Sequence, residues 1–323
     1  MRRRQAIGMA GAGAALLACP ALARAGPGAV SIIVADFPSA PAGIAARLLR
    51  AALAAALGRD VIVDFRPGAG GIVGLMAGAR ARADGSALTM LSPAIAAAPW
   101  LAARMDNTPA DFAPVGRISF APEVLVVAAS SPWHDLSDLL AALRADPGRV
   151  PTAFDGVWSS AEIAEVLMLD RAGLAARPMP GLRAGQGLAD GRIAFAMRPL
   201  PWALARIGAG ELRALAVSAP GPVASLPGVP NFRARGIDVA LGSWLVLAAP
   251  AGAGDEALAP AREALRRIMA RDQLRAALSE AGVPPSWEGA AGTARAMDAE
   301  YRLLGRIFTE AGVNVRQAAM AAR

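Results

Sequence analysis

Short β-branched runs alternate with segments of helical periodicity along this chain, and this alternation restricts the folds that it can adopt. The first run, Val30–Val34, is followed by a turn and by apolar residues at helical spacing that end at Gly58, where a helix C-cap is expected. Further strand-like runs follow at 61–65 and 87–91, with a helix predicted at 72–82 between them. Because strands that alternate with helices pair in parallel, the sequence predicts an α/β fold with a doubly wound sheet.

A second α/β series begins after a strand predicted at 123–128. The remaining predicted elements are strands at 150–154, 192–197, 211–217 and 243–249, and helices at 135–146, 159–171, 200–208, 254–270, 271–281 and 291–311. Two such units joined by two strand-like crossings predict two lobes around a cleft, with a hinge near 127–129 and 240–243. The expected boundaries are 26–128 plus 242–323 for lobe 1, and 129–241 for lobe 2.

The N-terminus has the pattern of a signal peptide over residues 1–25. Three arginines at 2–4 precede an apolar stretch at 7–18 and small residues suited to cleavage at 21–25. We therefore expect export to the periplasm, by either the general or the twin-arginine route. Cys19, the only cysteine, excludes an intrachain disulfide; it is either discarded with the leader or kept as a lipidated first residue. No later window reaches the roughly 18 strongly apolar residues that a membrane-spanning helix needs.

Charge and composition argue against several classes of function. All 33 basic residues are arginines, and loss of the four in the leader leaves 29 against 26 acidic residues, a formal charge of +3. The remaining arginines form no stripe interleaved with aromatic residues, which argues against nucleic-acid binding. His134 is the only histidine, and the chain has no zinc-hydrolase or serine-esterase motif. We therefore expect neither an enzyme nor a metal or cofactor site.

Several motifs occur in the order and spacing of one known family. The stretch Asp64–Gly71 reads DFRPGAGG. The glycines of Arg66–Gly74 fit turn and helix-packing positions better than a phosphate loop, because no Lys-Ser/Thr ending follows. The other motifs are Asp84–Leu91, Asp111–Val115, Gly210–Val217 with Leu226–Pro230, and Gly242–Gly252. Together these stretches resemble the Bug family, the solute receptors of tripartite tricarboxylate transport systems.

The resemblance implies a two-lobed periplasmic binding protein of the type II architecture, with a small carboxylate held between the lobes. It also implies a receptor that works with the membrane permease subunits of a tripartite transporter, and we expect this receptor to be a monomer. Two alternatives remain open. The chain could be a ligand sensor for a signalling partner, or a receptor whose pocket has been altered or lost.

In open α/β sheets the binding crevice lies beyond the carboxyl ends of the strands, where loops lead into helices. Helix starts carry free N–H donors and a partial positive charge, so two of them would clamp a dicarboxylate. In the loop at 36–43, Pro41 removes a donor and Gly43 stands where the family has an aspartate. The predicted contacts in lobe 1 are Phe37, Ser39, Ala40, Ala42 and Gly43, with Ser92 after the third strand. An altered ligand choice and an ordinary turn in a decayed site both fit this loop.

The predicted contacts in lobe 2 are Gly156, Trp158, Ser159, Ser160 and Arg198. The two serines precede a predicted helix, so their hydroxyl groups would either cap it or hold a carboxylate. Arg198 ends a strand and would either fork onto a carboxylate or lie solvated at the surface. Asp155 would repel an anion if it faced the cleft. The hypothesis is that backbone amides at 39–43 and 156–160 grip negative charge, with Arg198 assisting.

Overall fold

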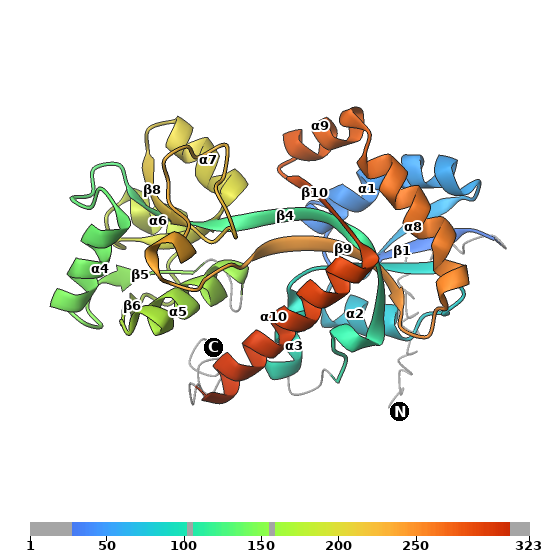
Figure 1. Ribbon diagram of the computed structural model, residues 1–323, viewed down its shortest axis with the longest axis horizontal. Helices are drawn as coiled ribbons and strands as arrows, with labels where there is room; N and C mark the ends of the chain where they lie inside the picture. The colour runs from blue at the N-terminus through green and yellow to red at the C-terminus, as the bar shows by residue number, and fades with distance from the viewer. Residues whose placement is uncertain (1–27, 102–105, 155–158, 311–323) are drawn as a thin grey trace, which may run out of the picture.

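The computed structural model describes residues 28–101, 106–154 and 159–310, so the predicted signal peptide lies outside the described residues. Two lobes lie side by side, joined by two long strands, β4 (Phe112–Ala128) and β9 (Gly242–Pro250), that run from one lobe into the other (Figure 1). Within the described ranges, no helix combines the length and the hydropathy that a bilayer crossing requires.

Lobe 1 is built on a mixed sheet with the strand order β10-β4-β9-β3-β1-β2. Its mutually parallel strands are β1 (Val30–Val34), β2 (Val61–Phe65) and β3 (Ala87–Leu91). β9 pairs antiparallel with β3 and β4, and β10 (Pro285–Gly289) pairs antiparallel with β4. The predicted parallel sheet is therefore confirmed for the first three strands only. β9 runs against β3 because the chain enters lobe 1 at this point from the opposite lobe.

Helices cover both faces of this sheet. One face carries α1 (Pro41–Leu57), α8 (Asp255–Met269) and α9 (Asp272–Glu280), and the other carries α2 (Ile72–Ala79), α3 (Ala94–Leu101) and α10 (Ala290–Glu310). In α1, Leu49 and Leu53 lie about one turn apart and are fully buried in the lobe 1 core. The helix ends at Gly58 in the left-handed conformation, as the sequence predicts.

In lobe 2, the second half of β4 pairs antiparallel with β7 (Ala196–Pro199) and β8 (Leu212–Val217). A short parallel pair, β5 (Pro151–Thr152) and β6 (Arg177–Pro178), lies in the same lobe. The helices of this lobe are α4 (Leu136–Ala145), α5 (Ser160–Ala172), α6 (Ala184–Ala189) and α7 (Leu200–Gly208). Single 3-10 turns are η1 (Ala69–Gly71) and η2 (Pro109–Asp111) in lobe 1 and η3 (Arg233–Arg235) in lobe 2.

β4 changes its partners where it passes between the lobes. As far as Pro122, which lies opposite Gly242, it pairs with β9, and from Glu123 onward it pairs with β7 and β8. The change of partners therefore precedes the predicted hinge at 127–129, whereas the chain returns to lobe 1 at Gly242, within the predicted 240–243.

The first half of β4 carries residues that ordinarily interrupt a strand, which is why the sequence predicted a strand only from 123 onward. Pro114 and Gly116 lie within the stretch that pairs with β9. The ladder accommodates them with register shifts between Pro114 and Gly116 and again between Arg117 and Ser119. The result is one continuous strand of 17 residues that belongs to the sheets of both lobes.

Candidate functional site

The loop between β1 and α1 presents a helix start at the carboxyl edge of the parallel strands. Ala40 is the N-cap residue, in an extended conformation, and no side chain caps the helix. Among the described residues, no hydrogen bond occupies the backbone N–H of Ala42 or of Gly43, and Pro41 has no N–H to offer. The two open donors, together with the helix dipole, are suited to an anion.

Gly43 is held in place by close packing. A Cβ at this position would lie 2.5 Å from the carbonyl oxygen of Phe37 and 2.8 Å from that of Pro38. No side chain fits there unless the loop moves away from the helix. The lack of an acidic side chain at Gly43 is therefore built into the path of the loop.

A cavity of about 420 Å³ adjoins this loop in lobe 1. Of the predicted contacts, Phe37, Ala42 and Ser92 line it, so the structure brings these three together. Ser39, Ala40 and Gly43 belong to the same loop, but they do not line the cavity. Phe37 stands at its edge with 61% of its surface exposed.

The glycine-rich segment after β2 forms another wall of this cavity, which the sequence analysis did not foresee. Pro67 to Gly71 line the cavity, and Gly68, at φ 129°, adopts a backbone conformation open only to glycine. The predicted packing role is confirmed at Gly74, where a Cβ would lie 2.5 Å from the Cα of Ala35. The segment follows β2, a parallel strand, and this position is the sequence signal that places it at the same edge of the sheet as the β1–α1 loop.

In lobe 2, the two serines at the start of α5 have different partners. Ser159 is the N-cap residue, and its Oγ accepts the N–H of Glu162 at 3.2 Å. Ser160 instead donates its hydroxyl to Oε1 of Glu123 at 2.7 Å. The predicted capping role is thus confirmed for Ser159, while the hydroxyl of Ser160 is used in neither of the predicted ways. The predicted contacts Gly156 and Trp158 lie outside the described residues.

Arg198 lies inside lobe 2, so the interpretation as a solvated surface arginine is wrong. Its side chain is 9% exposed, and its guanidinium carbon lies 4.3 Å from the centre of the Trp202 ring. Arg206 approaches the same ring at 3.9 Å. The burial arises because Arg198 is the third residue of β7, which is paired with the fully buried part of β4.

Glu123 is a buried acidic residue next to the start of α5, and the sequence analysis did not single it out. Its side chain is fully buried at the point where β4 enters lobe 2. Burial raises the pKa of Glu123 to about 7, although the Ser160 hydrogen bond and the positive charge of Arg198 both oppose the rise. Nothing in a strand-like run marks one carboxylate as buried, because its burial depends on segments distant in sequence.

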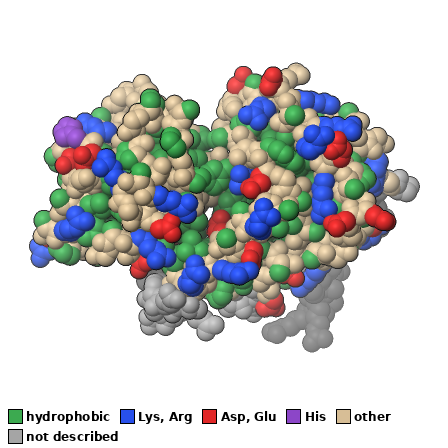
Figure 2. Space-filling model, in the orientation of Figure 1, with side chains coloured by type: hydrophobic (Ala, Val, Ile, Leu, Met, Phe, Trp, Pro, Cys, Tyr) green, Lys and Arg blue, Asp and Glu red, His purple; other side chains and the backbone are tan. Residues whose placement is uncertain are grey.

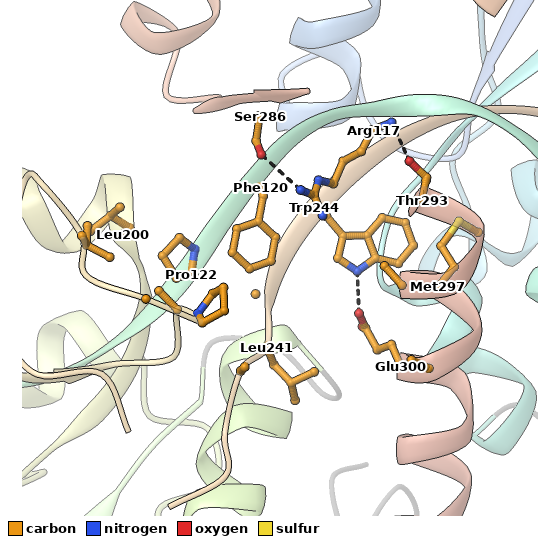
Figure 3. A pocket seen from close by; sticks show the side chains of 18 of the residues that line it. Arg117, Phe120, Pro122, Leu200, Leu241, Trp244, Ser286, Thr293, Met297 and Glu300 are labelled. Carbon is orange, nitrogen blue, oxygen red and sulfur yellow. Dashed lines mark hydrogen bonds between the residues drawn. The ribbon is translucent and has the colours of Figure 1, made fainter. Parts of the chain in front are cut away.

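A larger cavity, of about 840 Å³, lies beside the crossing strands, between α10 of lobe 1 and the 219–223 segment of lobe 2 (Figure 3). On its wall, Nε1–H of Trp244 donates to Oε2 of Glu300 at 2.7 Å, and burial raises the pKa of Glu300 to about 7. Arg117 pairs with Glu288 at 2.8 Å. None of the predicted contacts lines this cavity.

The two halves of the predicted site lie in different lobes and share neither cavity. Ser159, Ser160 and Arg198 line neither of them. Figure 2 shows a depression between the lobes, with hydrophobic side chains along it. A common site formed by both helix starts therefore stays a prediction. Among the described residues, no group of His, Cys, Asp and Glu side chains is placed to hold a metal ion.

Two α/β lobes joined by two crossing strands define a type II periplasmic-binding-protein fold, the architecture of solute receptors. The family described as the tripartite tricarboxylate transporter family receptor, TctC, matches residues 45–313, and the chain belongs to this family. The Protein BugT of Bordetella pertussis is 31% identical over 231 residues, which cover 69% of this chain and 71% of BugT.

Solved structures share this fold at lower sequence identity. A TctC solute binding protein from Polaromonas is 22% identical with a TM-score of 0.81, over 87% of this chain and 98% of that protein. An R. palustris protein with adipate is 24% identical with a TM-score of 0.71, over 88% of this chain and 97% of that protein. These likenesses confirm the predicted two-lobed α/β architecture.

Proposed function

We propose that this protein is a periplasmic receptor that captures a small dicarboxylate and delivers it to the permease subunits of a tripartite transporter. The observation that carries the proposal is the start of α1, where the N–H groups of Ala42 and Gly43 are open beside a cavity at the carboxyl edge of the parallel strands. The adipate bound to the R. palustris relative and the predicted signal peptide support it. Loss of labelled adipate uptake in a deletion strain would test the delivery step.

Capture would require the lobes to approach each other. The start of α5 is the lobe 2 element with N–H donors suited to the second carboxylate, and the Ser159 hydroxyl satisfies one of the helix donors there. The motion would be absorbed where β4 changes partners at Pro122 and Glu123 and where the chain returns at Gly242. Each lobe would then contribute one amide-rich helix start to one ligand.

Adipate is expected to raise the thermal unfolding midpoint, because a ligand that binds only the folded state stabilises it. At about 100 times its Kd the gain is about 2.7 kcal/mol. Scanning fluorimetry at pH 7 measures the shift, with adipamide as the control because it keeps the carbon skeleton without the charges. Equal shifts with both compounds, or no shift with adipate or with shorter and longer dicarboxylates, would contradict the proposal.

Asp36 bears on whether the ligand carries an amino group. It lines the lobe 1 cavity, and its Oδ1 accepts the N–H of Phe37 at 2.8 Å. A carboxylate on the wall attracts an ammonium group and repels further negative charge. The screen therefore pairs succinate with aspartate, which differ by one ammonium group. A larger shift with aspartate would assign the site to acidic amino acids, and a larger shift with succinate would assign it to unsubstituted diacids.

Replacement of Arg198 by alanine is expected to weaken binding of adipate more than binding of hexanoate, a monoanion of the same length. The substitution also removes the packing of Arg198 on Trp202, but this loss affects both ligands alike. The ratio of the two changes in Kd therefore reports the contribution of the positive charge of Arg198. Isothermal titration calorimetry of both acids measures this ratio. An equal loss for the two acids would remove Arg198 from the site.

A further inference from the structure

Glu123 connects the start of α5 to both strands that cross between the lobes. Its Oε1 accepts the hydroxyl of Ser160 at 2.7 Å, and its own N–H donates to Oγ of Ser218 at 2.7 Å. Ser218 in turn donates its hydroxyl to the carbonyl oxygen of Leu241, the residue before β9. One buried carboxyl group therefore touches the helix start proposed to bind the ligand, at the point where the lobes are joined.

The charged groups on the described elements packed against this carboxyl group lie on β7 and α5. From β7, Arg198 acts on it with positive charge. α5 carries Glu162 and Glu165, and Glu165 lies against Met197, whose N–H it accepts at 3.3 Å. Among the described residues, the nearest parts of β8 and β9, at Val217 and Gly242, are uncharged. Within the described part of the chain, Arg198 is thus the positive charge that acts on the Glu123 carboxyl group, and a ligand carboxylate at α5 would add a negative one.

We propose that Glu123 takes up a proton when a dicarboxylate binds at the start of α5, so that the receptor captures its ligand together with a proton. The inference rests on the proposed function. An ionised Glu123 and a ligand carboxylate would be like charges at one helix start, and burial leaves their repulsion poorly screened. Protonation of Glu123 removes this repulsion.

The same proton also changes the hydrogen bond to Ser160. A buried carboxylate requires a donor, so the ionised Glu123 holds the Ser160 hydroxyl toward itself. A protonated Glu123 carries its own O–H and requires this donor less, which frees the Ser160 hydroxyl to turn toward a bound carboxylate. Because burial raises the pKa of Glu123 to about 7, the exchange takes place near neutral pH, and affinity for a dicarboxylate falls as pH rises through 7.

The experiment compares adipate binding to the wild-type protein and to Glu123→Gln, which keeps an acceptor for Ser160 and cannot titrate. Calorimetry at pH 7 in phosphate and in Tris gives the number of protons taken up, because the two buffers differ in ionisation enthalpy. Because a group with a pKa of about 7 is already half protonated at pH 7, we expect uptake of about half a proton per adipate with the wild type and none with the variant. We also expect a loss of affinity of about fivefold or more between pH 6 and pH 8 in the wild type only.

Glu165→Gln is the matched control. Glu165 is also a buried carboxyl group of raised pKa and lies on α5, but it contacts Met197 and Thr152 and is not bonded to Ser160. This variant should keep the proton uptake of the wild type. Titration of adipate itself is common to all three proteins and cancels in the comparison.

Thermal unfolding without adipate checks that Glu123 titrates in the folded protein. The raised pKa of Glu123 contributes stability to the folded wild type. This contribution is complete below the pKa of the unfolded chain, 4.5, and is lost as pH rises through about 7. The midpoint of Glu123→Gln should therefore rise relative to the wild type between pH 5 and pH 8.5. A constant difference, or equal proton uptake by wild type and Glu123→Gln, would overturn the inference. Absence of adipate binding to either protein at every pH would instead overturn the proposed function, and the inference with it.

Discussion

Glu165→Gln is expected to make the protein more stable than the wild type at pH 9, by on the order of 4 kcal/mol, and to leave it nearly unchanged at pH 4.5. Glu165 is fully buried, and its burial raises its pKa from 4.5 to about 8. The folded protein therefore holds the proton that the unfolded chain has released. The stability that this proton contributes is complete below pH 4.5 and is lost progressively as pH rises to 8. The Glu165→Gln variant has no such contribution, so its stability does not change for this reason over the same range.

Urea unfolding at pH 4.5 and pH 9 measures the difference in free energy of unfolding, and the slope of each transition reports whether the same surface is exposed. Glutamine keeps an oxygen to accept the N–H of Met197, which leaves the local geometry of β7 in place. Glu123 and Glu300 also have raised pKa values, but they are present in both proteins and cancel in the difference. A variant that is less stable than the wild type at pH 9 would show that Glu165 is ionised in the folded state with a compensating partner.

Gly43→Ala is expected to destabilise the protein by about 1 to 3 kcal/mol and to abolish adipate binding. The added methyl group would lie 2.5 Å from the carbonyl oxygen of Phe37, which is backbone and cannot rotate away. The β1–α1 loop must then shift, and with it the N–H groups that we assign to the ligand. Urea unfolding gives the stability change, and calorimetry with adipate gives the binding change.

Gly208→Ala supplies the control for Gly43→Ala. Gly208 ends α7, and nothing lies within 4 Å of the position that a Cβ would take. The same chemical change there should be neutral or stabilise the protein by about 0.4 to 1 kcal/mol, since alanine restricts the unfolded chain. Equal effects at the two positions would contradict the close packing of the β1–α1 loop.

Much of lobe 1 could be predicted because local sequence determines it. The runs at 30–34, 61–65 and 87–91 are strands at those residues, and Gly58 ends α1, since β-branched runs and a left-handed glycine leave local signals. The family resemblance also gave the correct architecture. The elements β10, α3 and α6 were not predicted, because β10 (PSWEG) has no β-branched residue, α3 (AIAAAPWL) contains a proline, and α6 (AGQGLA) contains two glycines.

The candidate site was harder to predict, because burial of a charge depends on segments distant in sequence. Arg198 reads as an exposed strand-end residue until β4 and Trp202 are placed around it. Likewise, the hydroxyl of Ser160 fits a helix cap until Glu123, 37 residues earlier, lies beside it. Phe37, Ala42 and Ser92 were easier, since the carboxyl ends of parallel strands meet at one edge of the sheet whatever the rest of the chain does.

The pairing of Pro122 with Gly242 has a consequence for how such receptors can diversify. The segment 123–241 leaves lobe 1 and rejoins it at neighbouring positions on two adjacent strands, so it is topologically an insertion, and α3 and α10 of lobe 1 pack against its core. Exchange of this segment between genes would replace lobe 2 and leave the β2-β1-β3 strand order of lobe 1 unchanged. An exchanged segment would have to keep the apolar residues that pack against Ala96, Ala97 and Leu304 of lobe 1.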